Sequence, residues 1–243
     1  HRIEGPVLLH VLTEKGKGYG PAERDIEKRL HDTSQFDPET GLVQPSGRRS
    51  WTAAFSDAMV VLAARRDDVV MLTAAMPGST GLLPLAHADA SRVIDVGIAE
   101  QHAVTSAAGL AYAGLVPVIA VYSTFLSRAF DQLNLDVGLH GEHVVLVLDR
   151  AGITGDDGPS HHGILDMALG LRVPGLTVLA PSCEEDLVAL LDVAVDLDGP
   201  VLIRFPKGAV VARSALGPLA LTPARGLAGR TLRRPDRTIA TAD

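Results

Sequence analysis

The sequence predicts an α/β fold, in which helices cover both faces of a doubly wound, mostly parallel sheet. Two observations lead to this expectation. Short runs rich in valine, isoleucine and leucine alternate with longer helical segments between residues 51 and 203. These runs are apolar almost throughout, whereas strands that face water on one side alternate apolar and polar residues. A parallel sheet that is buried on both faces accounts for both observations.

The individual elements follow from local composition. Runs such as residues 69–72 have the β-branched character of strands, and the alanine-rich segment 103–113 is typical of a helix. Ser182 and Glu185 have the spacing of a capping box, which supports a helix start there. In order, the sequence predicts a helix over 51–65, strands over 69–72 and 92–95, a helix over 100–113, a strand over 116–121, a helix over 124–139, strands over 143–148 and 176–179, a helix over 183–195 and a strand over 201–203.

The segments on either side of this region differ from it in composition. Residues 7–12 form a short apolar run that predicts one strand, and the glycine-rich segment 13–21 ends it. Residues 22–49 are polar and contain proline and glycine turn signals, which predicts a connector with at most one short helix. The predicted domains are therefore residues 1–47, residues 48–212 as the doubly wound domain, and the proline- and arginine-rich residues 213–243 as a linker or the truncated start of another domain.

Composition indicates a globular protein and excludes several classes of partner. The chain has 243 residues and is 47% hydrophobic, 4% aromatic and 21% charged, as soluble globular domains are. A net charge of −7 argues against nucleic acid or an anionic membrane as the main partner. No apolar run approaches the roughly 20 residues that span a bilayer. The single cysteine, Cys183, rules out an internal disulfide and fits a reducing cytoplasm.

Glu100 is the residue on which most of the functional argument depends. It lies between the predicted strand over 92–95 and the helix that follows, among apolar and small residues. Burial favours the protonated form of a carboxyl group, whereas a helix N-terminus favours the anion. We therefore expect Glu100 to share a proton with a ligand nitrogen. The alternative is structural: a carboxylate that stabilises the helix N-terminus by a few tenths to about 1 kcal/mol without any catalysis.

The segments that follow five predicted strands hold the other polar candidates. In an open parallel sheet, ligands bind beyond the carboxyl ends of the strands. The segments begin at residues 73, 97, 122, 149 and 204, and all are rich in polar residues or glycine. The sequence therefore predicts a binding site along one edge of the sheet. Adjacent histidines such as His161 and His162 seldom bind one ion, so no metal site is expected there.

Four ordered strings in these segments resemble the pyrimidine-binding domain of transketolase-like, thiamine-diphosphate-dependent enzymes. They are DVGIAEQHAV, VYSTFLSRAFDQ, DRAGITGDDGPSHHG and IRFPKG. Among these enzymes they are most similar to the family of 1-deoxy-D-xylulose-5-phosphate synthases, and the resemblance covers about residues 6–212. The string GPVLLHVLTEKGKGYGPAE also resembles that family. The resemblance implies that residues 1–47 are the end of a diphosphate-binding domain plus a connector.

The resemblance implies thiamine diphosphate and Mg²⁺ as cofactors. Glu100 would bond the aminopyrimidine ring and favour the imino form that removes the C2 proton. Phe125 would stack on that ring, and Arg128 would face the same site. In this family the diphosphate and Mg²⁺ are held by a GDG motif and a following asparagine on another domain, and the sequence has no GDG. We therefore expect no metal ligand on this chain and no activity from the chain alone.

The resemblance also implies two small-molecule substrates, pyruvate and glyceraldehyde 3-phosphate. Tyr122, Arg150 and Lys207 match the positions that contact the substrate phosphate. Lys207 stands where some members carry arginine, so it keeps the charge without the bidentate fork. Three further side chains are implied to face the substrates and assist proton transfers: His31, Asp157 and His161. The product would enter isoprenoid, thiamine and pyridoxal precursor synthesis in the cytoplasm.

Three functions remain open from the sequence. The first is the synthase-type transferase, as part of a longer polypeptide or completed by a separate chain. The second is another transketolase-family enzyme, such as a ketol transferase or the β subunit of a 2-oxoacid dehydrogenase, and the phosphate set argues against that subunit. The third is a truncated, non-catalytic module that binds a partner. A homodimer, or completion by a missing domain, is expected because relatives cover the open faces of this domain.

Overall fold

A computed structural model describes residues 3–31, 33, 35–43 and 47–211, together with the backbone of three short strands beyond them. By its internal contacts the chain divides into two compact units, His1–Ser46 and Gly47–Asp243. The second unit contains the predicted sheet.

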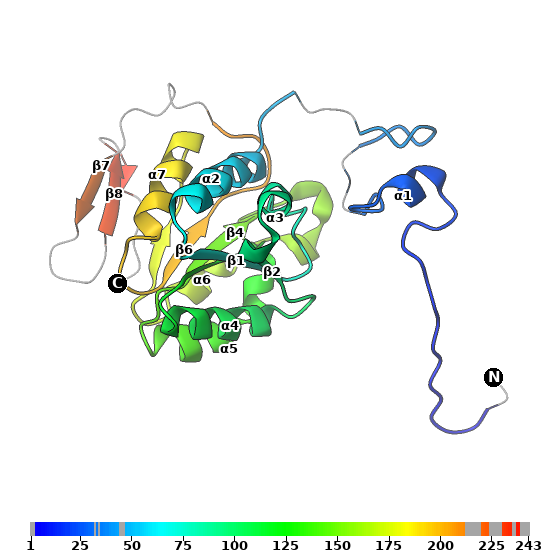
Figure 1. Ribbon diagram of the computed structural model, residues 1–243, viewed down its shortest axis with the longest axis horizontal. Coiled ribbons are helices and arrows are strands. Elements are labelled where there is room, and N and C mark those ends of the chain that lie inside the picture. Colours follow the sequence, from blue (N-terminus) through cyan, green and yellow to red (C-terminus); the bar gives the residue numbers. More distant parts are fainter. Residues whose placement is uncertain are drawn as a thin grey trace. The chain divides into compact units, whose positions relative to one another are not determined.

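A six-stranded sheet forms the centre of the second unit (Figure 1). Its strands are β1 (Val69–Thr73), β2 (Val93–Asp95), β3 (Val116–Tyr122), β4 (Val145–Asp149), β5 (Thr177–Leu179) and β6 (Val201–Arg204). Their spatial order is β2-β1-β3-β4-β6-β5, and every pairing is parallel. The expected parallel, doubly wound fold is confirmed. Because the chain returns from β2 past β1 to form β3, the topological switch point lies between the carboxyl ends of β1 and β3.

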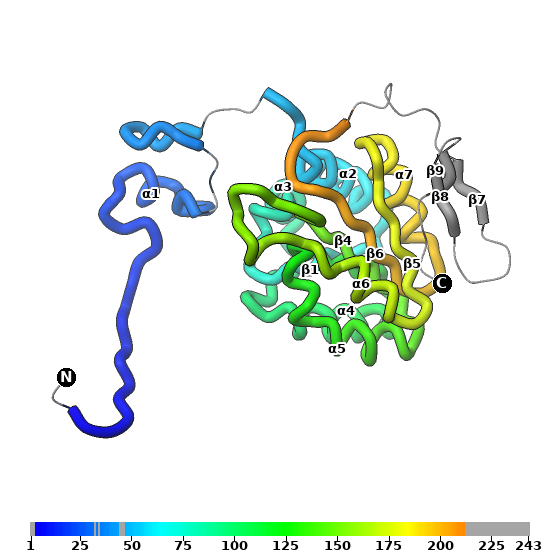
Figure 2. The backbone as a smooth tube through the Cα atoms, turned by 180° about the vertical axis from the view of Figure 1, so that it is seen from behind, coloured from blue at the N-terminus to red at the C-terminus, as the bar shows by residue number. Residues whose placement is uncertain are grey.

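Helices cover both faces of the sheet (Figures 1 and 2). On one face lie α2 (Trp51–Arg65), α3 (Leu83–Ala88) and α7 (Glu184–Ala194), and on the other lie α4 (Glu100–Tyr112), α5 (Phe130–Gln132) and α6 (Asp166–Gly170). Successive strand residues alternate between the two cores. In β4, Val145 and Val147 join the first core, whereas Leu146 and Leu148 join the second. Both faces of the strand are therefore dry, which explains its continuously apolar sequence.

The helix predicted over 124–139 is wrong as a continuous element. The segment instead forms a 3₁₀ turn (Ser123–Arg128), the short α5 and a π-helical turn (Leu133–Gly138). The Ser127 hydroxyl donates to the Thr124 carbonyl (3.0 Å), and the Thr124 hydroxyl donates to the Ser160 carbonyl (3.1 Å). Such side-chain bonds to the backbone compete with the regular helical ladder. The first turn is thereby joined to a neighbouring loop instead of continuing as an α-helix.

The other predicted helices and strands of the second unit are confirmed with small shifts at their ends. The capping box predicted from Ser182 and Glu185 is wrong. The N-cap is Cys183, and the carboxylate of Asp186 accepts a hydrogen bond from the Ser182 backbone N–H (3.2 Å). Asp186, the third residue of α7, thus accepts the kind of backbone hydrogen bond that the predicted capping box would have assigned to Glu185. The sequence analysis missed α3 and α6, which are both short.

The first unit contains one helix among its described residues, α1 (Gly20–Arg24). The strand predicted over 7–12 is wrong: none of the described residues pairs with this run, and its side chains are exposed, with Leu8 at 94%. An apolar run becomes a strand only when a neighbouring strand satisfies its backbone groups. The rest of the unit is held partly by Tyr19, whose hydroxyl donates to the Pro38 carbonyl (2.7 Å) and whose ring contacts Phe36.

The C-terminal segment 213–243 falls largely outside the described residues. Its described backbone contains β7 (Ala220–Pro223), β8 (Arg230–Arg234) and β9 (Arg237–Thr238). They pair in antiparallel fashion in the order β7-β8-β9. A linker or a truncated domain start remains our prediction for this segment.

Candidate active site

The predicted site residues of the second unit gather along the carboxyl edge of the sheet. Glu100 begins α4 shortly after β2, and Tyr122 is the last residue of β3. Arg150 follows β4, and Lys207 follows β6. Since parallel strands end at the same edge, four segments that are distant in sequence contribute to one rim. This rim includes the topological switch point.

Glu100 is buried at the start of α4, as the sequence predicted. Its side chain is only 5% exposed, and the preceding N-cap residue, Ala99, supplies no side-chain hydrogen bond to the helix. Within the described part of the chain, no residue donates a hydrogen bond to the Glu100 carboxylate or pairs with it. The side chain is largely buried, but its carboxylate oxygens are not among the fully buried polar atoms that lack a partner, so the carboxylate stays accessible at this edge of the sheet. The position is therefore suited to a ligand group that can share a proton with the carboxylate.

Aromatic rings line the rim after β3. The rings of Tyr122 and Phe125 stack with centroids 6.0 Å apart and an interplanar angle of 14°. The edge of His161 meets Phe125 at 5.9 Å and 72°. The Arg128 guanidinium lies 5.4 Å from the Phe125 ring centroid, within the range of a cation–π contact. The structure thus brings Phe125, Arg128 and His161 together, as expected of residues that share one site.

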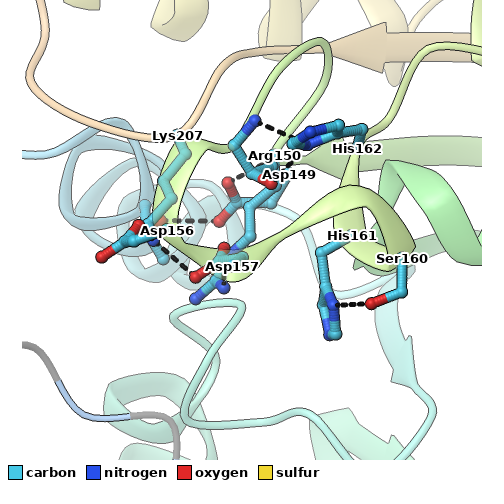
Figure 3. Close-up of polar contacts among 10 residues, drawn as sticks. Asp149, Arg150, Asp156, Asp157, Ser160, His161, His162 and Lys207 are labelled. Carbon is cyan, nitrogen blue, oxygen red and sulfur yellow. Dashed lines mark hydrogen bonds and ion pairs between the residues drawn. The ribbon is translucent and has the colours of Figure 1, made fainter.

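Two cations share one carboxylate in the next group of residues (Figure 3). The Asp157 carboxylate accepts hydrogen bonds from Arg150 Nη1 (2.7 Å) and from Lys207 Nζ (2.6 Å). Lys207 Nζ also donates to Asp156 (2.9 Å). The Arg150 guanidinium lies over the Tyr122 ring, 4.0 Å from its centroid. The three residues expected to bind a phosphate are therefore neighbours, connected through Arg150 and Asp157.

The backbone at the end of β4 is held firmly. The buried carboxylate of Asp149 accepts a hydrogen bond from the Thr52 hydroxyl (2.6 Å) and another from the Arg150 N–H (2.6 Å). Arg150 has a φ of +61°, a left-handed conformation that is uncommon for residues other than glycine. The N–H of Ala151 then donates to the Phe205 carbonyl (2.9 Å). Strain at such a position is often maintained where a side chain must point to a functional site.

The two adjacent histidines have different surroundings. His162 Nδ1 accepts a hydrogen bond from the Thr154 N–H (3.2 Å) and lies 3.0 Å from the Thr154 hydroxyl, so His162 stabilises the loop itself. His161 Nδ1 lies 2.9 Å from the Ser160 hydroxyl, and Figure 3 shows this pair on the side of the loop away from Lys207. Within the described residues, no group of three or more metal-ligating side chains occurs. His161 therefore contacts Ser160 and Phe125, whereas His162 contacts Thr154.

Gly163 closes the loop that carries these residues. Its N–H and C=O exchange hydrogen bonds with Gly152, both at 2.8 Å. A methyl group at Gly163 would lie 2.5 Å from the Ser123 Cβ and 2.7 Å from the Arg150 carbonyl oxygen. Only glycine allows the returning loop to approach β3 and β4 this closely.

We expect Gly163→Ala to lower the free energy of unfolding by about 1–3 kcal/mol, because the added methyl group collides with backbone that cannot move freely. Urea denaturation of the 243-residue chain measures this change. The matched control is Gly109→Ala in α4, where an added methyl group meets nothing within 4 Å and should stabilise the helix by about 0.5–1 kcal/mol. Equal effects of the two substitutions would contradict the close approach.

The sequence analysis did not predict a buried ion pair that joins α6 to β6. The carboxylate of Asp166, at the start of α6, is 1% exposed and accepts a hydrogen bond from Arg204 Nε (2.7 Å). It also accepts from the Met167 N–H (2.8 Å). Arg204 is the last residue of β6, three positions before Lys207. A charged residue at a strand end was the one available signal, and it did not identify a partner 38 residues away.

His31 lies in the first unit, where it is exposed. The structure therefore does not test whether it joins the other predicted site residues, and its role remains a prediction.

No helix in the described part of the chain is long and apolar enough to cross a bilayer.

Comparison with known proteins agrees with the fold. Residues 48–212 match the model of the transketolase pyrimidine-binding domain family. The match covers more than half of the chain, and the chain belongs to this family.

The most informative relatives are 1-deoxy-D-xylulose-5-phosphate synthases. The chain is 53% identical over 209 residues to the synthase of Corynebacterium glutamicum strain R, covering 86% of this chain and 33% of the relative. It is also 53% identical over 210 residues to the synthase of Mycobacterium tuberculosis strain H37Ra, with the same coverage. The resemblance drawn from the four sequence strings is confirmed. The chain spans about a third of the length of these relatives.

Solved structures show the same fold. A split-gene transketolase described as an inactive β4 tetramer is 29% identical, with a TM-score of 0.61 over 68% of this chain and 53% of that one. Transketolase from Leishmania mexicana is 20% identical, with a TM-score of 0.62 over 72% of this chain and 28% of that one. The second likeness concerns the fold alone.

Proposed function

We propose that this chain is the pyrimidine-binding part of a 1-deoxy-D-xylulose-5-phosphate synthase, a thiamine-diphosphate-dependent enzyme that condenses pyruvate, with loss of CO₂, with glyceraldehyde 3-phosphate. The observation that carries the proposal is Glu100, a buried carboxylate without a partner among the described residues, at the edge where this fold binds ligands. The identity of 53% to synthases supports the choice of reaction.

The residues after β2 and β3 fit the pyrimidine end of thiamine diphosphate. Thiamine diphosphate supplies a carbanion when bound. Glu100 would share a proton with a ring nitrogen and so favour the imino form of the ring. The half-buried ring of Phe125 offers a face for stacking, and Arg128 lies against that ring. A planar, nitrogen-containing ligand would therefore meet one proton-sharing group and one aromatic face.

The residues after β4 and β6 fit the phosphate of the second substrate. Arg150 and Lys207 place two positive charges around the Asp157 carboxylate. The Arg150 guanidinium also lies over the ring of Tyr122. Arg150 would offer its planar fork to the phosphate, and Lys207 a single charge. We propose that Asp157 orients these two cations, in addition to facing the substrates. His161, beside Phe125, would face the substrates and assist proton transfers.

The remaining parts of the enzyme are proposed to come from elsewhere. Diphosphate and Mg²⁺ would be bound by a domain that corresponds to the other two thirds of the relatives' length, and His31 would approach from the segment that leads there. The chain alone should therefore bind thiamine diphosphate weakly and be inactive. The inactive state named for the split-gene transketolase tetramer supports this expectation.

The test is a carboligation assay with pyruvate, glyceraldehyde 3-phosphate, thiamine diphosphate and Mg²⁺. We would measure the chain alone and a chimera in which it replaces the matching third of the Corynebacterium glutamicum synthase. We expect no activity from the chain alone and synthase activity from the chimera, with the parent synthase as control. A folded chimera that instead accepts only a ketose phosphate donor would identify a transketolase-type enzyme. A folded chimera with neither activity would favour a non-catalytic module.

We also propose that the complete enzyme is a cytoplasmic homodimer. The support is three exposed apolar side chains on the second unit: Tyr112 at the end of α4, Leu135 in the π-helical turn and Leu139 directly after it. The ring of Tyr112 contacts that of His140, next to Leu139, and exposed apolar side chains that lie together are commonly covered by a partner. Sedimentation of the chain at increasing concentration should show self-association, and a monomer at all concentrations would argue against it.

A further inference from the structure

We infer that Asp156 sets the affinity of the proposed phosphate subsite by competing with the substrate phosphate for Lys207. The inference rests on the proposed function, because it names a residue that regulates that same subsite. Two neighbouring carboxylates, Asp156 and Asp157, both bind the Lys207 ammonium, at 2.9 and 2.6 Å.

The two carboxylates differ in how firmly they are held. Asp157 is 16% exposed and is bound by both Arg150 and Lys207. Asp156 is 88% exposed, and Lys207 is its one ion-pair partner within the described residues. An exposed single pair contributes little to stability, whereas a carboxylate shared by two cations is costly to displace. An incoming anion would therefore replace Asp156 and leave Asp157 in position.

The surroundings of both side chains favour their charged forms. The hydrogen bond from Lys207 holds the pKa of the Asp156 carboxyl below its usual value. Partial burial acts to lower the pKa of Lys207, but the hydrogen bonds to Asp156 and Asp157 raise it overall. Figure 3 shows Lys207 directed between the two carboxylates. A phosphate oxygen that approaches Lys207 competes with Asp156 for the charge of the ammonium group, and it also meets the repulsion of the Asp156 carboxylate.

Titration with inorganic phosphate tests the inference on the 243-residue chain. The readout is the shift of the N–H signals of residues 150–158 and 204–208 in nuclear magnetic resonance spectra, at a pH where phosphate is dianionic. We expect Asp156→Asn, which keeps the size of the side chain, to lower the dissociation constant for phosphate about two- to fivefold, and raised salt to reduce this gain. The control is Glu142→Gln, at a half-buried position just before β4. It removes the same charge at the opposite edge of the sheet and should change the constant much less.

A double-mutant cycle separates competition from a general charge effect. In a Lys207→Gln background, Asp156→Asn should improve phosphate binding much less, because the contact with Lys207 is already lost and only the relief of charge repulsion remains. An equal gain with and without Lys207, or a gain no larger than that of Glu142→Gln, would overturn the inference and leave the phosphate subsite intact. If phosphate shifts none of these signals in any variant, the proposed subsite is wrong and the inference fails with it.

Discussion

Replacing Glu100 by glutamine is expected to lower the turnover of the chimeric synthase by about 10²–10⁴-fold, while the affinity for thiamine diphosphate changes far less. The amide has almost the size of the carboxylate, and Glu100 is 5% exposed, so the shape of the site should be retained. The amide cannot share a proton with the pyrimidine ring. Turnover would be measured at saturating cofactor, and affinity by calorimetric titration of thiamine diphosphate.

The control distinguishes catalysis from a helix N-terminal effect. Glu185 lies in the first turn of α7 and is exposed. Glu185→Gln removes the same charge from a helix N-terminus and should change stability by less than about 1 kcal/mol, with turnover unchanged. If Glu100→Gln also leaves turnover unchanged, Glu100 is only a helix-terminal carboxylate and its catalytic assignment is wrong.

The sheet could be predicted from the sequence because burial on both faces leaves a simple signature. Each of β1, β3 and β4 has buried side chains along its whole length, so an apolar run and a strand coincide. Residues 7–12 have the same signature and no strand. Composition gives the tendency of a segment to be buried, but pairing depends on a neighbouring strand, which local sequence does not reveal.

The site could be predicted in part for a related reason. Parallel strands place their carboxyl ends at one edge, so residues after β2, β3, β4 and β6 were expected to meet. The partners within the site could not be predicted. The contact of Lys207 with Asp156, and that of Thr52 with Asp149, join residues 51 and 97 positions apart. Spacing along the chain carries no information on such contacts.

Arg204→Met is expected to produce the largest loss of stability, because it leaves a buried charge without its partner. The Asp166 carboxylate is 1% exposed, and its remaining donor would be the Met167 N–H. Breaking a buried pair costs about 3–5 kcal/mol, and since Arg204 is 23% exposed we expect about 3 kcal/mol. Urea denaturation measures the loss. Arg65→Met, which breaks the exposed pair with Asp192, should cost less than about 1 kcal/mol.

Removing both partners of this pair tests the cause of the loss. The double variant Arg204→Met with Asp166→Asn has no buried charge, so it should recover most of the stability that Arg204→Met loses. The pair also connects the end of the loop that carries Asp157 to the strand that leads to Lys207. Amide hydrogen exchange over residues 150–165 should therefore increase in Arg204→Met more than in Arg65→Met. Equal exchange in the two variants would show that Arg204 stabilises the fold without positioning this loop.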